Sequence, residues 1–271
     1  LGPEQVGDLQ STVSSALTGD TILLRDGDYE LNGDFLWFSV SGVTLRSLSG
    51  NPESVILNGA YITTEIITVA ASNVTIAELT IIKPYTHAIH VTSSAAGDTL
   101  NTKIYRVNVI DPREQAIKIN TYSGGDTFSD NGEIACSNLK LTDSGRPHVN
   151  PISGGCYTGG IDAHQSKGWT IRDNEIEGFW CENGLAEHAI HLWRGSRDTI
   201  IERNMMTNNA RGVGFGLASS GSARIYDDNV CPQSSGKYVG HYNGIIRNNF
   251  IYANSQPLMN SASGFDCGIC L

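Results

Sequence analysis

A four-residue pattern of small, apolar, variable and apolar positions recurs along the chain. Its copies begin at successive offsets of 28, 44, 29, 23 and 56 residues. They are Ala88-Ile-His-Val, Ala116-Ile-Lys-Ile, Gly160-Ile-Asp-Ala, Ala189-Ile-His-Leu, Gly212-Val-Gly-Phe and Gly268-Ile-Cys-Leu. Because alternate residues of a strand point to the same face, the apolar positions predict a strand with one buried side. The pattern therefore indicates one strand that is repeated in successive structural units.

A second pattern alternates with the first and ends in asparagine. Its asparagines are Asn108, Asn138, Asn174, Asn204 and Asn249. Each pair of patterns marks one coil of about 30 residues, and self-similarity at that period indicates a solenoid. An Asn at a tight bend tolerates left-handed backbone and can bond its counterparts in the coils above and below. We expect these asparagines to share one corner of the solenoid and to form a structural ladder.

The repeats predict an all-β fold, a single-stranded parallel β-helix. The side chains expected to point inward are Ile89, Val91, Ile117, Ile119, Ile190, Leu192, Val213 and Phe215. Segment 3–17 has the spacing of an amphipathic helix, which would cap the first coil. We expect one domain over 1–271, with the cap in 1–18, coils over 19–271 and an incomplete last coil.

Composition narrows the classes of function. The formal net charge of −10, from 18 basic and 28 acidic residues, disfavours a general binder of nucleic acids or anionic membranes. No long uninterrupted apolar run is present, so we predict no membrane span.

Six cysteines form an even set without the two paired C-x₂-C spacings of a four-cysteine zinc site. Disulfides are their expected use, and they indicate a secreted or otherwise extracytoplasmic protein. Other pairings remain open, but two preferred pairs would each bracket an inserted loop. The preferred pairs are Cys136 with Cys156 and Cys181 with Cys231, and a third is Cys267 with Cys270.

The outward positions of the repeated strand are rich in ionisable and aromatic side chains. The third residues of the copies form a predicted column of His90, Lys118, Asp162, His191, Gly214 and Cys270. Two residues further on, a second column contains Thr92, Asn120, His164, Trp193 and Gly216. Neighbours within a column can touch because adjacent coils are about 4.8 Å apart. Five of the seven histidines lie in or beside these strands, namely His87, His90, His164, His188 and His191. This clustering is the strongest functional signal in the chain.

The flanks and connections of the same strands add to this signal. The strands are flanked by Glu114, Gln115, Glu187, His188, Arg211 and Arg194. Long segments reach or leave the strands at 142–159, 177–188, 252–267, 92–102, 120–132 and 216–243. Long connections in a repeat protein gather on its working face, so we predict that they wall this sheet on both sides and form a groove. An extended groove suits an oligosaccharide, stacked on Trp193, Trp180 or Tyr157.

The opening segment Gly19-Asp-Thr-Ile-Leu-Leu-Arg-Asp-Gly-Asp-Tyr29 resembles the first coil of the right-handed parallel β-helix, or pectate-lyase-like, superfamily. As a fold, the resemblance covers essentially the whole chain. Segment 160–209 is similar to the chondroitinase B and alginate lyase group. In that likeness Leu192-Trp-Arg-Gly195 matches the group's arginine-glycine motif, which gives Arg194 the role of its arginine, and the lysine base corresponds to His164. The group's acidic calcium ligands fall near Tyr157 and Gly159, which carry no carboxylate, so no calcium or other cofactor is predicted.

The leading hypothesis is a polysaccharide lyase that acts on a uronate-containing glycan. β-Elimination needs a base for the proton beside the carboxylate and cations that neutralise this carboxylate. His164 or Lys118 is the candidate base, and histidine is favoured because it is mostly neutral near pH 7, whereas Asp162 would oppose a lowered pKa of Lys118. The candidate neutralising groups are Arg194, Arg211 and His191. The candidate substrate-binding residues are Asp162, Trp193, Glu187, His188, Arg211 and His90, with a structural role as the alternative for each.

Three other hypotheses remain open from the sequence. A glycoside hydrolase would use paired carboxylates, Asp162 with Glu187. A non-catalytic module would bind glycans or self-associate end to end through the uncapped C-terminal coil. A transition-metal site would use His164, His188, His191 and Asp162, although no local spacing motif supports it.

Overall fold

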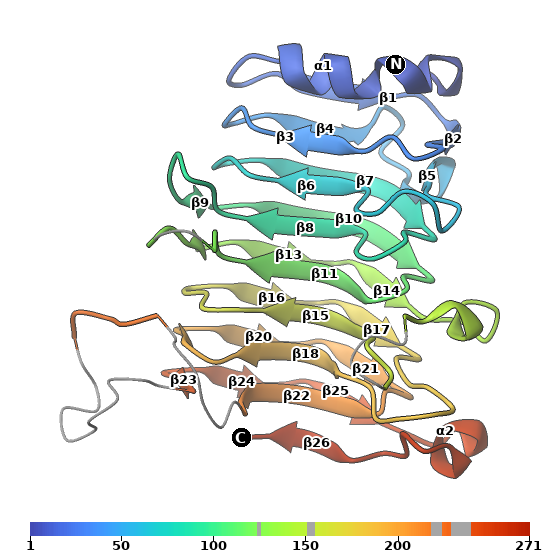
Figure 1. Cartoon of the computed structure of the whole chain (residues 1–271), viewed down its shortest axis with the longest axis vertical. Helices are drawn as coiled ribbons and strands as arrows, with labels where there is room; N and C mark the ends of the chain where they lie inside the picture. Colours follow the sequence, from blue (N-terminus) through green and yellow to red (C-terminus); the bar gives the residue numbers. More distant parts are fainter. Residues whose placement is uncertain (124–125, 151–154, 218–223, 229–239) are drawn as a thin grey trace.

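The computed structural model describes residues 1–123, 126–150, 155–217, 224–228 and 240–271. In it the chain winds coil after coil along one axis and forms a parallel β-helix with three faces (Figure 1). Two faces belong to one 14-stranded sheet, because β7 (Thr75–Ile82) and β10 (Lys103–Ile110) each run through the corner between them. These strands bend at Glu78 and Arg106, whose φ angles are 56° and 52°.

The remaining strands of this sheet divide between its two faces. One face adds β1 (Thr21–Leu24), β4 (Thr44–Ser47), β13 (Glu133–Ala135), β16 (Thr170–Arg172), β20 (Ile200–Glu202) and β24 (Ile245–Arg247). The other adds β2 (Gly27–Glu30), β5 (Val55–Asn58), β14 (Asn138–Lys140), β17 (Glu175–Glu177), β21 (Met205–Thr207) and β25 (Phe250–Tyr252).

The third face is a parallel sheet of eight strands that contains all six copies of the repeated pattern. Its strands are, in spatial order, β3 (Leu36–Phe38), β6 (Ile67–Val69), β8 (Ile89–Thr92), β11 (Gln115–Asn120), β15 (Gly159–Ala163), β18 (His188–Trp193), β22 (Arg211–Gly216) and β26 (Cys267–Cys270). Figure 1 looks onto this sheet, and the connections project on both sides of it. Short elements in the connections are β9 (Thr99–Leu100) paired with β12 (Ser129–Asp130), β19 (Ser196–Arg197) paired with β23 (His241–Tyr242), η2 (Pro52–Ser54), η3 (Arg146–His148) and α2 (Gln256–Asn260).

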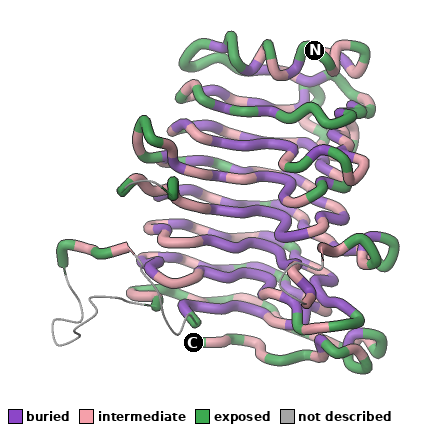
Figure 2. Tube along the Cα trace, in the orientation of Figure 1, coloured by how far each residue is buried: buried purple, intermediate pink, exposed green. Residues whose placement is uncertain are grey.

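The predicted inward side chains form the core of the solenoid. Ile89, Ile117, Ile190 and Val213 are fully buried, and Phe215, near the end of the coils, is 8% exposed. Figure 2 shows the buried residues following the strands through successive coils. Full burial of such a side chain contributes roughly 1.5–3 kcal/mol, so the alternation of apolar residues fixes which face of each strand points inward.

The N-terminal cap is shorter than predicted. Segment 3–17 divides into a 3₁₀ segment, η1 (Pro3–Asp8), whose backbone is not helical at Gln5, and a helix, α1 (Leu9–Ser15). Leu9 and Val13 are buried against the first coil, but Leu17 lies beyond the helix end and is 72% exposed. No helix in the described ranges is long and apolar enough to cross a membrane.

The predicted asparagine ladder exists, but two of its predicted members are wrong. Asn174 Nδ2 donates to Asn204 Oδ1 at 2.9 Å, and Asn204 Nδ2 donates to Asn249 Oδ1 at 3.0 Å. Asn108 and Asn138 pair with each other in register and lie one position outside this ladder. The reason is the bend: Asn174 directly follows the left-handed residue Asp173, whereas Asn108 lies two residues after Arg106.

Two of the predicted disulfide pairs are also wrong. Cys156 bonds Cys181, with a Cα separation of 5.7 Å, and Cys136 forms no disulfide. Cys136 occupies the left-handed bend between β13 and β14 and is exposed, whereas Cys156 and Cys181 lie in the loops that lead into neighbouring strands β15 and β18. The pair Cys267–Cys270 is confirmed, and Cys231 lies outside the described residues.

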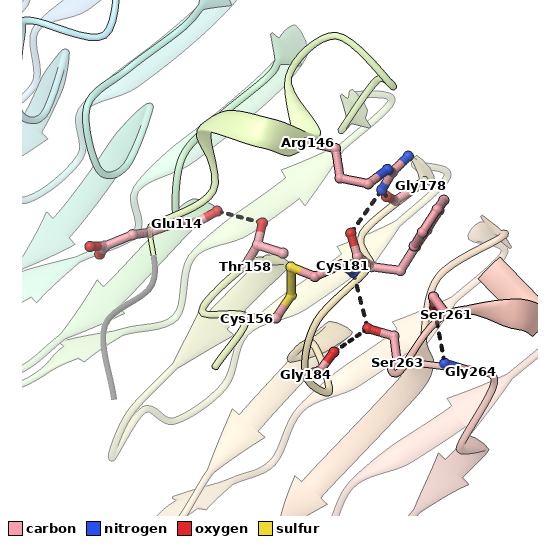
Figure 3. Close-up of a disulfide and its surroundings, with 11 residues drawn as sticks. Glu114, Arg146, Cys156, Thr158, Gly178, Cys181, Gly184, Ser261, Ser263 and Gly264 are labelled. Atoms are coloured by element: carbon pink, nitrogen blue, oxygen red, sulfur yellow. Dashed lines mark hydrogen bonds between the residues drawn. A yellow bond between two sulfur atoms is a disulfide. The ribbon is translucent and has the colours of Figure 1, made fainter. Parts of the chain in front are cut away.

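The connection around the first disulfide is further tied by hydrogen bonds (Figure 3). Arg146 Nη1 donates to the carbonyls of Gly178 and Trp180 at 2.7 and 2.8 Å, and the guanidinium lies 3.6 Å from the Trp180 ring centroid. Cys181 N donates to Ser263 Oγ at 3.0 Å. Three connections on this side of the eight-stranded sheet are therefore fastened to one another.

Candidate active site

The outward column predicted on the eight-stranded sheet is present in the predicted register. Lys118 pairs with His90 on one side and with Asp162 on the other, and Asp162 pairs with His191. His191 in turn pairs with Gly214. Parallel pairing of β8, β11, β15, β18 and β22 therefore brings together residues that are separated by many positions in the sequence.

The centre of this column is a compact polar cluster of Lys118, Tyr157, Asp162 and His164. Lys118 Nζ forms an ion pair with Asp162 Oδ2 and lies 3.2 Å from His164 Nε2. His164 Nε2 is also 3.1 Å from Asp162 Oδ2. Lys118 further donates to the hydroxyl of Tyr157 at 3.4 Å. A carboxyl group, an amine, an imidazole and a phenol thus meet on the outer face of β11 and β15.

The charges of the cluster are fixed by its burial and by its partners. Burial alone would raise the pKa of Asp162, but Lys118 and then His164 hold it well below its usual range. Burial alone would lower the pKa of Lys118, but Asp162 and then Tyr157 raise it. At neutral pH the cluster therefore contains a carboxylate and an ammonium ion. Asp162 Oδ1 makes no hydrogen bond with the described part of the chain and lies 3.9 Å from His191 Nδ1.

A second polar group lies on the next coil, where β18 begins. The Glu187 carboxylate is 3.3 Å from His191 Nδ1 and 3.8 Å from His188 Nδ1; the second distance is beyond hydrogen-bond range. Burial acts to raise the pKa of Glu187, but the two histidines lower it to about 2. Burial lowers the pKa of His188, so this side chain is neutral. The group supplies one further carboxylate beside the cluster.

His164 and Trp193 form the accessible part of the site. The His164 side chain is 33% exposed, whereas those of Lys118 and Asp162 are 6% and 7% exposed. The rings of His164 and Trp193 lie 6.0 Å apart between centroids, and Trp193 packs edge-on against His191 at 4.6 Å. A ligand on this face would therefore meet an imidazole and an indole first.

The other predicted site residues lie outside this cluster and have partners of their own or are buried. Arg194 directly follows β18, is partly exposed, and its carbonyl accepts a hydrogen bond from Gln165 N at 3.3 Å. Arg211 is paired with Asp266 at 2.9 Å, and His90 with Glu65 at 2.9 Å. His188 is 1% exposed, so it lies beneath the surface of the site.

Sequence reasoning missed two contacts on this face. Tyr157 was expected only as a stacking platform, although its hydroxyl contacts Lys118. Glu114 lies 3.4 Å from His87 Nε2; burial raises the pKa of Glu114 and lowers that of His87 to about 4. The position of Glu114 just before β11 was a usable signal, but Tyr157 belongs to a loop whose path the repeat does not determine.

The ligand sets that could hold a metal ion differ from the predicted one. Among the described residues two sets have ligand atoms within 4.8 Å of one another: Glu187 with His188 and His191, and His188 with Cys267 and Cys270. The predicted set of His164, His188, His191 and Asp162 is not one of them. Only His188 and His191 of that set recur, and His164 and Asp162 instead contact Lys118.

The connections beside the sheet enclose a cavity of about 390 Å³. It is lined by Arg146, Val149, Trp180, Cys181 and Pro257, among others, and lies against the Cys156–Cys181 disulfide. The polar cluster does not line it. The cavity thus belongs to the side wall, next to the face that carries the cluster.

No protein-family model matches the chain, and no curated protein sequence matches it. Solved structures do. Pectate lyase Pel9A is 10% identical, with a TM-score of 0.50 over 91% of this chain and 72% of its own. An alginate lyase from Paenibacillus sp. str. FPU-7 is 11% identical, with a TM-score of 0.49 over 92% and 96% of the two chains. PfbA, a surface adhesin of Streptococcus pneumoniae, is 13% identical, with a TM-score of 0.48 over 99% and 78%. At such identities the likeness to Pel9A establishes the fold alone, and it confirms the predicted right-handed parallel β-helix.

Proposed function

We propose that this protein is an extracytoplasmic polysaccharide lyase that cleaves a uronate-containing glycan by β-elimination on the outer face of β11, β15 and β18. The observation that carries the proposal is the arrangement of His164. Its imidazole is partly exposed, and its Nε2 lies 3.1 Å from a buried carboxylate, that of Asp162. A partly exposed imidazole oriented by a buried carboxylate is an arrangement that enzymes use for general-base catalysis.

His164 rather than Lys118 is the base in this proposal. Asp162 accepts a hydrogen bond from Nε2–H, which leaves the lone pair of Nδ1 for the substrate proton. Nδ1 makes no hydrogen bond to the residues that the structure describes. Lys118 is unsuited to the role because its pKa is raised and its side chain is almost fully buried. A protonated amine cannot accept a proton.

The elimination can be written with the groups that surround His164. Nδ1 takes the proton from the carbon beside the uronate carboxylate. The electron pair of that C–H bond forms the new double bond as the bond from the β-carbon to the glycosidic oxygen breaks. Arg194 binds the carboxylate, where negative charge develops. The Tyr157 hydroxyl gives its proton to the leaving oxygen, and the adjacent Lys118 ammonium, 3.4 Å away, stabilises the phenolate.

Three further observations support a secreted protein that acts on glycans. Trp193 offers a flat aromatic surface beside His164, as sugar rings require for stacking. The disulfides Cys156–Cys181 and Cys267–Cys270 are typical of extracytoplasmic proteins. Pel9A, named as a pectate lyase, has the same fold, which supports the proposal by analogy only.

The hydrolase alternative that uses Asp162 with Glu187 lacks a proton donor. Both retaining and inverting hydrolysis need one carboxyl group that is still protonated at working pH. The pKa values of Asp162 and Glu187 are instead lowered, that of Glu187 to about 2. Neither can act as the general acid near neutral pH.

The test is to incubate the full chain separately with alginate, chondroitin, pectate and a neutral glycan. Ultraviolet absorbance reports the unsaturated uronate, and a second assay reports new reducing ends. Reducing ends together with the absorbance support the lyase. Reducing ends alone indicate a hydrolase. If neither signal appears but the glycan still binds, the protein is a binding module. Each of these two results overturns the proposal.

Variants separate chemistry from folding. His164→Gln should lower kcat by about 100- to 10,000-fold, the usual contribution of a general base. Tyr157→Phe should lower kcat while leaving KM nearly unchanged, and Arg194→Ala should raise KM as well. The matched control is His148→Gln, in a histidine of η3 that stacks on Tyr61 at 4.2 Å and lies outside the cluster. Full lyase activity in His164→Gln would show that the base lies elsewhere.

A further inference from the structure

His188 is a buried histidine whose hydrogen-bonding capacity is not used. It lies at the start of β18 and is 1% exposed, and neither ring nitrogen forms a hydrogen bond with the described residues. An imidazole buried without partners is costly, because its donor and acceptor have lost their water. Such a group calls for an explanation beyond packing.

The space next to His188 is provided by a glycine. A Cβ added at Gly214 would come within 2.7 Å of His188 Nε2, so the imidazole lies over the backbone of β22 where another residue would place its side chain. Gly214 pairs in register with Cys270, and Arg211 pairs with Cys267. The strand beyond Gly214 thus brings two cysteines to the imidazole.

The two cysteines complete a ligand set. One ligand atom from each of His188, Cys267 and Cys270 lies within 4.8 Å of the other two. Cys267 and Cys270 are separated by two residues, the C-x₂-C spacing that commonly supplies a pair of thiolates to zinc, and in this structure they form a disulfide. Two thiolates and one imidazole are the protein ligands of a soft divalent cation with a fourth position open.

We propose that Cys267, Cys270 and His188 form a redox-gated binding site for Zn²⁺ or a similar soft divalent cation. In the oxidised protein the disulfide occupies the sulfur atoms and the site is closed. A dithiol reductant opens it: two electrons pass to the Cys267–Cys270 bond, the reductant becomes a cyclic disulfide, and two cysteine thiols form. Metal binding then releases two protons from these thiols, and water takes the fourth position.

Glu187 supports the site from the other side of the ring. Its carboxylate lies 3.8 Å from His188 Nδ1. Metal-bound histidines usually donate their second N–H to a carboxylate, which fixes the tautomer and the ring orientation. A proton on Nδ1, the nitrogen beside Glu187, leaves the lone pair of Nε2, the nitrogen next to Gly214, for the metal ion. Glu187 is therefore a positioning residue for the metal site.

The experiment uses the full chain and Co²⁺ as a spectroscopic substitute for Zn²⁺. The protein is reduced with dithiothreitol, freed of reductant and metal without air, and titrated with Co²⁺. Thiolate-to-cobalt charge-transfer absorption and intense tetrahedral d–d bands should appear and saturate at one Co²⁺ per chain. Zn²⁺ should abolish them, and the oxidised protein should show neither band.

The variants identify the ligands. Cys270→Ser and His188→Gln should weaken Co²⁺ binding by about 100-fold or more, and Glu187→Gln by about 10- to 100-fold, as expected for loss of an outer partner. A double Cys136→Ser and Cys231→Ser variant is the matched control and should bind normally. Cys156 and Cys181 are unchanged in every variant and are treated with the same reductant, so they contribute no difference between the variants. An unchanged spectrum in Cys270→Ser, equal binding by oxidised protein, or no charge-transfer band in reduced wild type would each overturn the proposal. Circular dichroism of each variant establishes that a loss of binding is not a loss of fold.

Discussion

Removing one member of the Lys118–Asp162 pair is expected to destabilise the fold strongly. The two side chains are 6% and 7% exposed, so neither ion is solvated by bulk water once its partner is gone. Among the described residues, Lys118→Met would leave the Asp162 carboxylate with only two imidazoles nearby, those of His164 at 3.1 Å and His191 at 3.9 Å. Breaking a buried pair in this way costs about 3–5 kcal/mol, because the remaining charge stays desolvated.

The double variant distinguishes the cost of burial from the attraction within the pair. Lys118→Met combined with Asp162→Leu removes both ions and fills similar volumes. Such replacements are often neutral or stabilising by about 1–4 kcal/mol. The double variant should therefore be more stable than either single variant. Guanidinium unfolding at neutral pH, followed by tryptophan fluorescence, measures all four proteins. Losses below about 1 kcal/mol in the single variants, as at a surface pair, would refute the reasoning, and so would losses that simply add.

The same pair predicts a dependence on pH. The pKa of Asp162 in the folded protein is well below its usual value, so its ionised form stabilises the fold above about pH 4. This contribution is lost as the pH falls through the folded-state pKa. In Lys118→Met, the ammonium ion no longer opposes the effect of burial, which raises the pKa of Asp162. The carboxylate is therefore neutralised at a higher pH. The stability gap between wild type and Lys118→Met should thus be largest near neutral pH and shrink in acid; a constant gap would contradict the assignment.

Three other predictions concern the frame around the site. The Cys156→Ser and Cys181→Ser double variant should lose about 3.5 kcal/mol of unfolding free energy in guanidinium titrations, from the closure entropy of a loop with a sequence separation of 25; no change in midpoint would show that the bond does not constrain the unfolded chain. Asn204→Ala should cost about 2–3 kcal/mol by removing ladder bonds to buried groups, whereas Asn108→Ala, outside the ladder, should cost less than about 1 kcal/mol; equal losses would refute the register. The pKa of His87 is lowered to about 4 in the folded protein, so the unfolded chain binds this proton first as the pH falls. Stability should therefore fall as the pH drops from about 6.5 to 4. In His87→Asn the melting temperature should depend less on pH across that window.

The strand register of the site was predictable because parallel stacking preserves it whatever the connection contains. Lys118 and Asp162 are 44 residues apart, yet they pair because each is the third residue of the same repeated strand. The asparagine prediction failed in part because it aligned the copies of the second pattern on their final asparagine. The backbone aligns instead on the left-handed residue at each bend, which precedes Asn174 by one position and Asn108 by two.

What the repeat could not predict lies in the connections. Tyr157 and Cys156 belong to a segment that enters β15 from outside the coil, so no periodic position fixes their neighbours. The same holds for the ligand set of His188, Cys267 and Cys270. Its C-x₂-C spacing is visible in the sequence, but the histidine comes from an earlier coil, and only the pairing of β18, β22 and β26 brings it there.

The row of ionisable groups on β11, β15 and β18 is unfavourable for folding. This cost is itself an argument that the row has a function. Lys118, Asp162, His188 and His191 lie outside the solenoid core, yet each is at most 5% exposed. A solenoid needs only small or neutral polar residues at these positions, and burying ions there costs desolvation that pairing at best offsets. The cost falls on consecutive coils, and the 33% exposed side chain of His164 is the one to which the proposed elimination requires access. Buried charges that orient an exposed base are expected of a catalytic site, where stability is exchanged for preorganisation.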